Sequence, residues 1–294
     1  MHSESDPLPM SDPQFALHTL MWHRAPLAEV LGHAVELGLS ALDLGALPGC
    51  GHADPGAGDP DAEAARVAGM LPSGLRVVAV TADHAGLSSL DGEEREAGVR
   101  YTIGALGLAE ALGAGVVGTS LGSVPKGVAN EQCLCRAAEA INACFGQYAG
   151  PVRLAVELHV NDVVNDLAKA ERLLELAGQP GLGVAFDTSL LYHNRIHHAD
   201  AFQRLGDRLL HVHLRGATRE TYFAVPGHDE VDFGGFFSLL TGTGYGGAMS
   251  LELYEVPERY GLSTLEAARE SLRYLRSLWP PGNGGPPSSW RRPS

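Results

Sequence analysis

Residues 152–159 read VRLAVELH, an apolar run that ends in a carboxylate and an imidazole. Similar runs follow downstream: GVAFD at 183–187, LLHVH at 209–213 and AMSLE at 248–252. Short apolar runs separated by helical patterns are typical of parallel strands that are buried on both faces. The sequence therefore predicts four consecutive buried strands, each ending in a residue type that binds metal ions: Glu157, Asp187, His213 and Glu252.

The rest of the chain repeats the same strand-then-helix unit. Four earlier strands are predicted at residues 15–17, 39–44, 76–81 and 115–120, each followed by a polar loop or a helical pattern. Eight such units predict an α/β fold of the (β/α)8 TIM-barrel type. A doubly wound open sheet is the alternative, but it normally has a glycine-rich turn after its first strand, and residues 17–22, LHTLMW, contain no glycine.

We expect a single catalytic domain at residues 14–279 between a flexible N-terminal tail (1–13) and a Pro/Gly-rich disordered tail (280–294). Two helix starts are marked in the sequence. Asp59 precedes Pro60 as an N-cap, and residues 263–266, STLE, form a capping box. The polar segment that follows His213 is predicted to be a long loop as far as Asp232.

Composition narrows the possible partners and compartment. The chain has 21 basic and 35 acidic side chains, a net charge of −14, which disfavours nucleic acid as a partner. The four cysteines do not have zinc-site spacing, so we expect reduced thiols in a cytoplasmic protein: Cys50, Cys133, Cys135 and Cys144. We find no signal-peptide pattern and no membrane-length apolar run, so we expect no membrane association.

The four strand-end residues favour a metal site. Side chains at the carboxyl ends of consecutive barrel strands converge on one mouth. Three carboxylates and one imidazole suit Mn²⁺ or Mg²⁺, and also accept Co²⁺ or Zn²⁺. Each residue alone has an ordinary structural explanation, such as a salt bridge for a glutamate or a helix cap for Asp187. Their occurrence on four successive strands favours one shared metal ion.

Several motifs resemble a known family. They are AVELH at 155–159, FDT at 186–188, HVH at 211–213, GHDEVDF at 227–233 and GYGG at 244–247. Together, over roughly residues 15–278, they resemble the xylose-isomerase-like TIM-barrel superfamily, which includes sugar isomerases and epimerases, sugar dehydratases and AP-endonuclease-type enzymes.

The resemblance implies roles for particular residues. Glu157, Asp187, His213 and Glu252 match the single-metal ligand set of the ketose epimerases, in which the two glutamates also serve as the catalytic acid/base pair. Arg219 occupies the place of a substrate-binding arginine.

The chain departs from the epimerase pattern at two positions. Leu190 stands where the epimerases have a histidine, and Val163 stands where they have a second acid. His193 is a candidate replacement for that histidine. Further residues are expected to line the mouth, with a substrate-binding role predicted for the first three: Trp22, His84, His159, His18, His23 and Arg215. His211 is expected to be a buried structural residue.

We therefore expect a divalent-metal-dependent isomerase or epimerase of a sugar, ketose or related polyhydroxy carbonyl compound, acting by enediolate proton transfer. The alternative is a lyase, an inosose-type or keto-acid dehydratase, on the same site. An AP-endonuclease-type repair enzyme, which would need several metals and a basic face, and a non-catalytic sugar-binding protein are less favoured. A homodimer or homotetramer is expected by analogy only.

Overall fold

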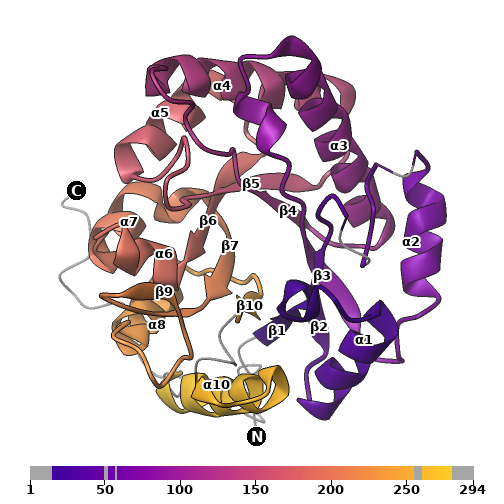
Figure 1. Ribbon diagram of the computed structural model, residues 1–294, viewed down its shortest axis with the longest axis vertical. Coiled ribbons are helices and arrows are strands. Elements are labelled where there is room, and N and C mark those ends of the chain that lie inside the picture. Colours follow the sequence, from indigo (N-terminus) through magenta and orange to yellow (C-terminus); the bar gives the residue numbers. More distant parts are fainter. Residues whose placement is uncertain (1–14, 50–51, 57, 255–259, 280–294) are drawn as a thin grey trace, which may run out of the picture.

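The computed structural model describes residues 15–49, 52–56, 58–254 and 260–279. In this part of the chain, eight parallel strands close into a barrel in the order β1-β10-β7-β6-β5-β4-β3-β2, and the helices form an outer ring (Figure 1). The predicted TIM barrel is confirmed. The two predicted tails, residues 1–13 and 280–294, lie outside the described residues.

The barrel strands lie close to the predicted positions. They are β1 Phe15–His18, β2 Ala41–Gly45, β3 Arg76–Thr81, β4 Val116–Thr119, β5 Arg153–Glu157, β6 Leu182–Asp187, β7 Leu209–Leu214 and β10 Met249–Leu251. The helices are α1 Leu27–Glu36, α2 Pro60–Ala68, α3 Gly92–Ala111, α4 Asn130–Gln147, α5 Leu167–Ala177, α6 Thr188–His193, α7 His198–Leu205, α8 Phe233–Gly242 and α10 Thr264–Leu278.

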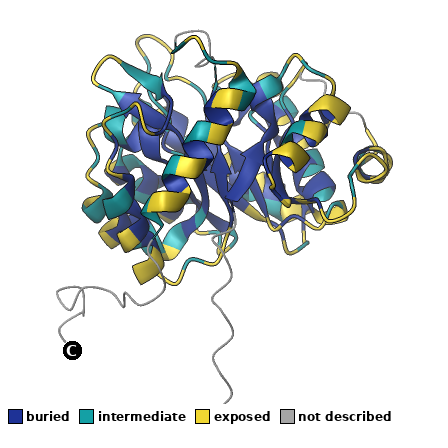
Figure 2. Cartoon of the chain, turned by 90° about the horizontal axis from the view of Figure 1, so that it is seen from below, coloured by how far each residue is buried: buried dark blue, intermediate teal, exposed yellow. Residues whose placement is uncertain are grey.

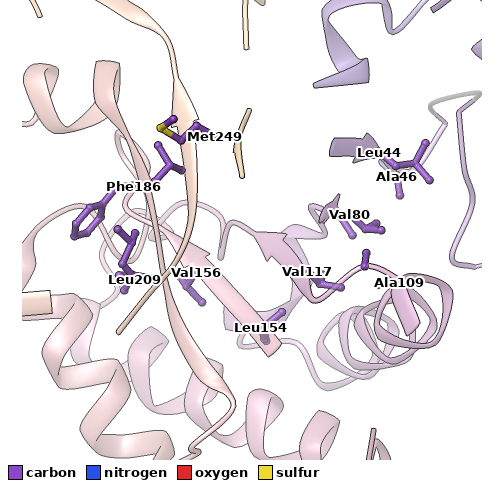
Figure 3. Packing of buried hydrophobic residues seen from close by; sticks show 14 of the residues in the cluster. Leu44, Ala46, Val80, Ala109, Val117, Leu154, Val156, Phe186, Leu209 and Met249 are labelled. Atoms are coloured by element: carbon purple, nitrogen blue, oxygen red, sulfur yellow. The ribbon is translucent and has the colours of Figure 1, made fainter. Parts of the chain in front are cut away.

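The main core lies between the strands and the helices. Branched and aromatic side chains on the outward face of the strands pack there, including Leu154, Val156, Phe186 and Met249 (Figure 3). The strands are buried, while the helices alternate buried and exposed faces (Figure 2). Removal of this apolar surface from water is the main stabilising contribution to the barrel.

The inside of the barrel is built in two layers. Successive side chains of a strand alternate between its faces, so residues two apart share the interior. A lower layer contains small buried side chains: Ala16, Ala41, Ala79, Ala155, Ala185 and Ala248. Two residues further along each strand, a polar side chain forms the upper layer: His18, Asp43, Thr81, Glu157, Asp187 and Ser250. Because the side chains of the lower layer are small, the polar side chains above them can point into the barrel interior near its mouth.

The helix-start predictions are confirmed. The Asp59 side chain accepts hydrogen bonds from the backbone N–H groups of Asp61 and Ala62. Ser263 and Glu266 form the capping box. Gly178 ends α5 with φ of 63°, a left-handed conformation that glycine adopts without a Cβ clash.

The segment between β7 and α8 differs from the prediction. A single long loop was expected, but Gly216–Thr218 (β8) and Thr221–Ala224 (β9) form an antiparallel two-stranded hairpin. The short helix α6 begins directly after β6, and Asp187 caps it, which is the helix-cap explanation that the sequence offered for this residue. Both elements lie next to the barrel mouth and hold candidate site residues.

The described residues allow the predictions about cysteines and membrane spans to be compared with the structure. Cys133, Cys135 and Cys144 are free thiols, as predicted, and Cys50 lies outside the described residues. Within the described ranges, the structure contains no helix that is both long enough and apolar enough to cross a membrane.

The two-layer interior predicts that added volume in the lower layer is destabilising. Ala155→Leu should lower the free energy of unfolding by about 1–3 kcal/mol, because the extra methyl groups have no space between the strands. Urea denaturation would measure the change. Ala65→Leu, on the exposed face of α2, is the matched control. Equal stability of the Ala155→Leu protein and wild type would contradict the packed interior.

Candidate metal centre

Four strand-end side chains meet at the mouth of the barrel. Glu157, Asp187, His213 and Glu252 each place a ligand atom within 4.8 Å of the others. Two carboxylates converge on one imidazole nitrogen: His213 Nδ1 lies 2.8 Å from Glu157 Oε1 and 3.1 Å from Glu252 Oε2. The strand register brings the group together, because Asp187 pairs with His213 and Glu252 directly follows β10.

The two carboxylate oxygens of Asp187 have different contacts. Oδ1 accepts hydrogen bonds from the Ser189 N–H and hydroxyl, both at 2.7 Å, and from the Leu190 N–H at 3.2 Å. Oδ2 is buried and lies 2.6 Å from Arg215 Nη2, but none of the residues that the structure describes donates a well-directed hydrogen bond to it. Asp187 therefore caps α6 with one oxygen and keeps the other facing the cluster.

Arg215 is a buried cation of the site. The sequence predicted that it lines the mouth, but indicated no specific role for it. Its Nη1 lies 3.2 Å from Glu252 Oε1, and its Nε donates to Ser189 Oγ at 2.8 Å. The guanidinium also lies near the rings of Tyr222 (5.7 Å) and Phe223 (5.4 Å) of the β8–β9 hairpin. The hairpin thus covers the residue that pairs with two of the three cluster carboxylates, Asp187 and Glu252.

The charges of the cluster stabilise one another. Burial by itself lowers the pKa of His213, but Asp43, Glu157 and Glu252 raise it well above its usual range. Burial raises the pKa of Glu252, yet Arg215 and His213 lower it overall. The pKa of Asp187 is raised, chiefly by burial and despite Arg215. A buried group of three carboxylates offers charge and lone pairs to a cation.

The residues present fit a divalent metal ion. Three carboxylates and one imidazole are a suitable donor set, and no described residue donates a hydrogen bond of good geometry to the buried Asp187 Oδ2. Glu157, Asp187, His213 and Glu252 would hold the ion.

The polar contacts on the Nε2 side of His213 were not anticipated. Asp43 lies 2.8 Å from His211 Nε2 and 3.1 Å from His213 Nε2, through the same oxygen. Thr81 donates its hydroxyl to the other Asp43 oxygen at 2.9 Å. His211 is buried beside Asp43, as expected for a structural residue. A repeated sequence pattern could have indicated that these polar residues face the interior, since ALH, ALD, AVT and AMS match the AVE and AFD triplets of β5 and β6.

Two of the predicted substrate-binding residues share one aromatic neighbour. Tyr222 of β9 lies 6.4 Å from the His159 ring and 5.3 Å from the His193 ring, between centroids. His159 is half-buried near Glu157; burial lowers its pKa, but the Glu157 carboxylate and the Val160 carbonyl raise it overall. These contacts place His159 and His193 beside the hairpin. Their predicted substrate contacts stay predictions.

Arg219 occupies the turn of the same hairpin. Its side chain is 90% exposed and its Nε lies 4.0 Å from Glu230 Oε2. Arg219 and His193 both line an open depression of about 1170 Å³ that also includes Glu230. The structure thus places Arg219 at the outer side of the hairpin, away from the buried cluster of Arg215.

The other two predicted contacts have structural partners. His84 caps the 3₁₀ turn Ala85–Ser88, because its Nδ1 accepts from the Gly86 N–H at 3.2 Å. Trp22 is half-buried, with its ring 4.7 Å from that of His33 on α1. His84 thus caps a 3₁₀ turn and Trp22 packs against α1, and the substrate-binding role predicted for each is untested.

The two departures from the epimerase pattern are apolar core positions. Leu190 and Val163 are both fully buried. The neighbouring Asp162 does not replace the missing acid at the mouth, because its carboxylate accepts the N–H groups of Leu121, Gly122 and Val164. These positions therefore offer no polar contact to a substrate.

Comparison with known proteins supports the family. Curated relatives include an inosose dehydratase of Mesomycoplasma hyopneumoniae (strain 7448), 26% identical over 155 residues that cover 46% of this chain and 51% of the relative. An inosose dehydratase of Salmonella agona is 24% identical over 168 residues, 50% of this chain and 54% of the relative. The chain thus spans about half the length of the curated relatives it matches.

Solved structures share the fold at low sequence identity. An L-ribulose 3-epimerase has a TM-score of 0.75 at 19% identity and covers 91% of this chain and 94% of its own. The 3-keto-D-glucoside 4-epimerase YcjR from E. coli has a TM-score of 0.74 at 16% identity, with 90% and 99% coverage. The IOLI protein, solved with a zinc atom, has a TM-score of 0.71 at 15% identity, with 90% and 99% coverage.

The family profile described as xylose isomerase-like TIM barrel matches residues 31–278, which include the whole candidate metal centre. The closed barrel and the strand-end cluster agree with that match. The chain belongs to the xylose isomerase-like TIM-barrel family.

Proposed function

We propose that this protein is a divalent-metal-dependent isomerase or epimerase of a sugar, ketose or related polyhydroxy carbonyl compound. The observation that carries the proposal is the convergence of Glu157 and Glu252 on His213 Nδ1, at 2.8 Å and 3.1 Å. The two glutamates come from β5 and β10, which are separated by β6 and β7 around the barrel. They therefore approach the centre from different sides, as a two-base proton transfer requires.

The cluster residues have distinct roles in this proposal. A metal ion held by the four residues would polarise the substrate carbonyl and acidify the neighbouring C–H bond. One glutamate then removes that proton, and the other returns a proton to the other face or to the adjacent carbon. Arg215 sits beside Asp187 and Glu252 and offsets their charge. The hairpin aromatics over Arg215 help to exclude water from the cluster.

A lyase is the second candidate, and Asp83 favours it. Asp83 follows β3 and is half-buried, and its Oδ1 accepts the Ser120 N–H at 2.6 Å. Burial and the Glu157 charge raise the pKa of Asp83 to about 6. A carboxyl group protonated near neutral pH could protonate a departing β-hydroxyl, the step that distinguishes a dehydratase. The inosose dehydratase names of the curated relatives point to the same alternative.

Removal of cluster carboxylates should abolish metal-induced stabilisation. Wild type should unfold at a higher temperature in Mn²⁺, by the equivalent of about 2.7 kcal/mol when the ion is at a hundred times its dissociation constant. Glu157→Gln and Asp187→Asn should lose most of this shift, because each removes an anionic ligand. Glu96→Gln, a change at an exposed surface glutamate, should retain it. A wild type that binds no divalent ion would refute the metal centre.

Proton exchange should separate the two candidate reactions. We expect the Mn²⁺-loaded protein in heavy water to incorporate deuterium beside the carbonyl of at least one member of a ketose and inosose panel. Glu252→Gln should slow the exchange by about 10²–10⁴-fold, because it removes an acid/base group. Mass spectrometry and NMR would follow the label. Exchange without loss of water favours the isomerase, and a product with a new double bond favours the lyase.

The raised pKa of Asp83 predicts a pH dependence of stability. Between about pH 4 and 6, the folded metal-free protein binds a proton at Asp83 that the unfolded chain has lost. The contribution of this residue to stability is therefore full below about pH 4 and is lost as the pH rises to 6. Asp83→Asn should flatten this part of the wild-type profile while retaining the contact to Ser120. Superimposable urea-denaturation profiles of the two proteins would contradict the assignment.

A further inference from the structure

Two groups of potential ligands share one imidazole. His213 belongs to the group with Glu157, Asp187 and Glu252, and also to a deeper group with His18 and Asp43. The upper group faces Nδ1 of His213, and Asp43 faces Nε2. Which nitrogen keeps a proton therefore decides which group can hold the metal.

Asp43 is surrounded by hydrogen-bond donors. Its side chain is 0% exposed, and one oxygen, Oδ2, contacts both His211 Nε2 (2.8 Å) and His213 Nε2 (3.1 Å). The other oxygen accepts from the Thr81 hydroxyl at 2.9 Å. The hydroxyl proton of Thr81 points at one oxygen, and two imidazole nitrogens lie against the other. Asp43 is therefore placed to accept hydrogen bonds and not to donate them.

An acceptor oxygen that faces two imidazole nitrogens fixes the positions of their protons. Since Asp43 Oδ2 cannot donate, both imidazoles that contact it must present an N–H at Nε2. His213 then has Nδ1 as the nitrogen that can give its lone pair to a metal. Nδ1 is also the nitrogen that Glu157 and Glu252 approach.

His18 restrains the ring without competing for the proton. It is 1% exposed, and neither of its ring nitrogens has a hydrogen-bond partner among the described residues. Its ring meets that of His213 edge to face, with 5.2 Å between centroids. Packing of this kind limits rotation of the His213 ring, while Asp43 sets the position of its proton.

We propose that Asp43 is the positioning residue of the metal centre: it holds the proton on His213 Nε2 and thereby directs Nδ1 towards the site formed with Glu157, Asp187 and Glu252. The inference rests on the proposed metal-dependent function and adds to it a residue outside the four ligands. Partners that orient a ligating histidine are a general feature of metal sites, and their loss commonly weakens metal binding about 10- to 100-fold.

Asp43→Asn is the direct test. The amide has nearly the same size and keeps an oxygen for Thr81, but it places an NH₂ group where His213 needs an acceptor. His213 must then accept through Nε2, which puts its proton on Nδ1 and blocks the ligating nitrogen. We expect the dissociation constants for Mn²⁺ and Zn²⁺, measured by competition with a chromogenic chelator, to rise about 10- to 100-fold.

Two further variants separate positioning from general damage. Thr81→Val removes a hydrogen bond from the same carboxylate but leaves Oδ2 untouched, so metal affinity should stay within about threefold of wild type. His18→Leu removes a potential ligand of the deeper group but keeps a side chain of similar size packed against the His213 ring, so it should also leave affinity nearly unchanged. Loss of metal binding in His18→Leu, with a folded protein, would place the metal in the deeper group and overturn the proposal.

Nitrogen-15 NMR of the histidines tests the proposal even if Asp43→Asn does not fold. In the Zn²⁺-loaded wild type, the His213 proton should reside on Nε2 and exchange slowly with water. A proton on Nδ1, or unchanged metal affinity in folded Asp43→Asn, would overturn the role of Asp43 while leaving the metal centre intact. A wild type that binds neither ion would remove both this proposal and the proposed function.

Discussion

The alternation of side chains along each barrel strand is the constraint on which the site depends. Residues two apart on a strand share the barrel interior. On strand after strand, the deeper of these is an alanine and the one nearer the mouth is polar, as in Ala155 with Glu157 and Ala185 with Asp187. Because alanine fills little of the interior, the polar side chains can turn inward and meet. A site built in this way is held by the backbone of the barrel itself.

Charge balance explains why such a polar layer is compatible with burial. Asp43, Glu157, Asp187 and Glu252 contribute −4, while Arg215 and protonated His213 contribute +2, which leaves −2 in the metal-free cluster. Buried charge of one sign is costly unless it is paired. A divalent cation that displaces the His213 proton changes the total to −4 + 1 + 2 = −1. The fixed charges of the barrel therefore favour a cation at its mouth.

The four clustered residues could be predicted from the sequence because each ends an apolar run. The role of Asp43 could not be predicted, because its partners, His211 and His213, lie about 170 positions away in the chain. The β8–β9 hairpin was missed because its strands are short and lie in a polar segment. Arg219 lies exposed on the turn of this hairpin, and its predicted substrate-binding role stays a prediction.

In the proposed isomerase or epimerase, the hairpin also bears on substrate choice. Leu190 and Val163 are buried and apolar, so contacts to substrate hydroxyls would have to come from other elements. Tyr222 and Phe223 of β9 reach the Arg215 guanidinium, and Tyr222 also meets the rings of His159 and His193. The hairpin therefore links the buried cluster to the polar rim of the mouth. A change in its length or aromatic content would alter selectivity without touching the four clustered residues, which is why the reaction type is easier to infer from this chain than the substrate.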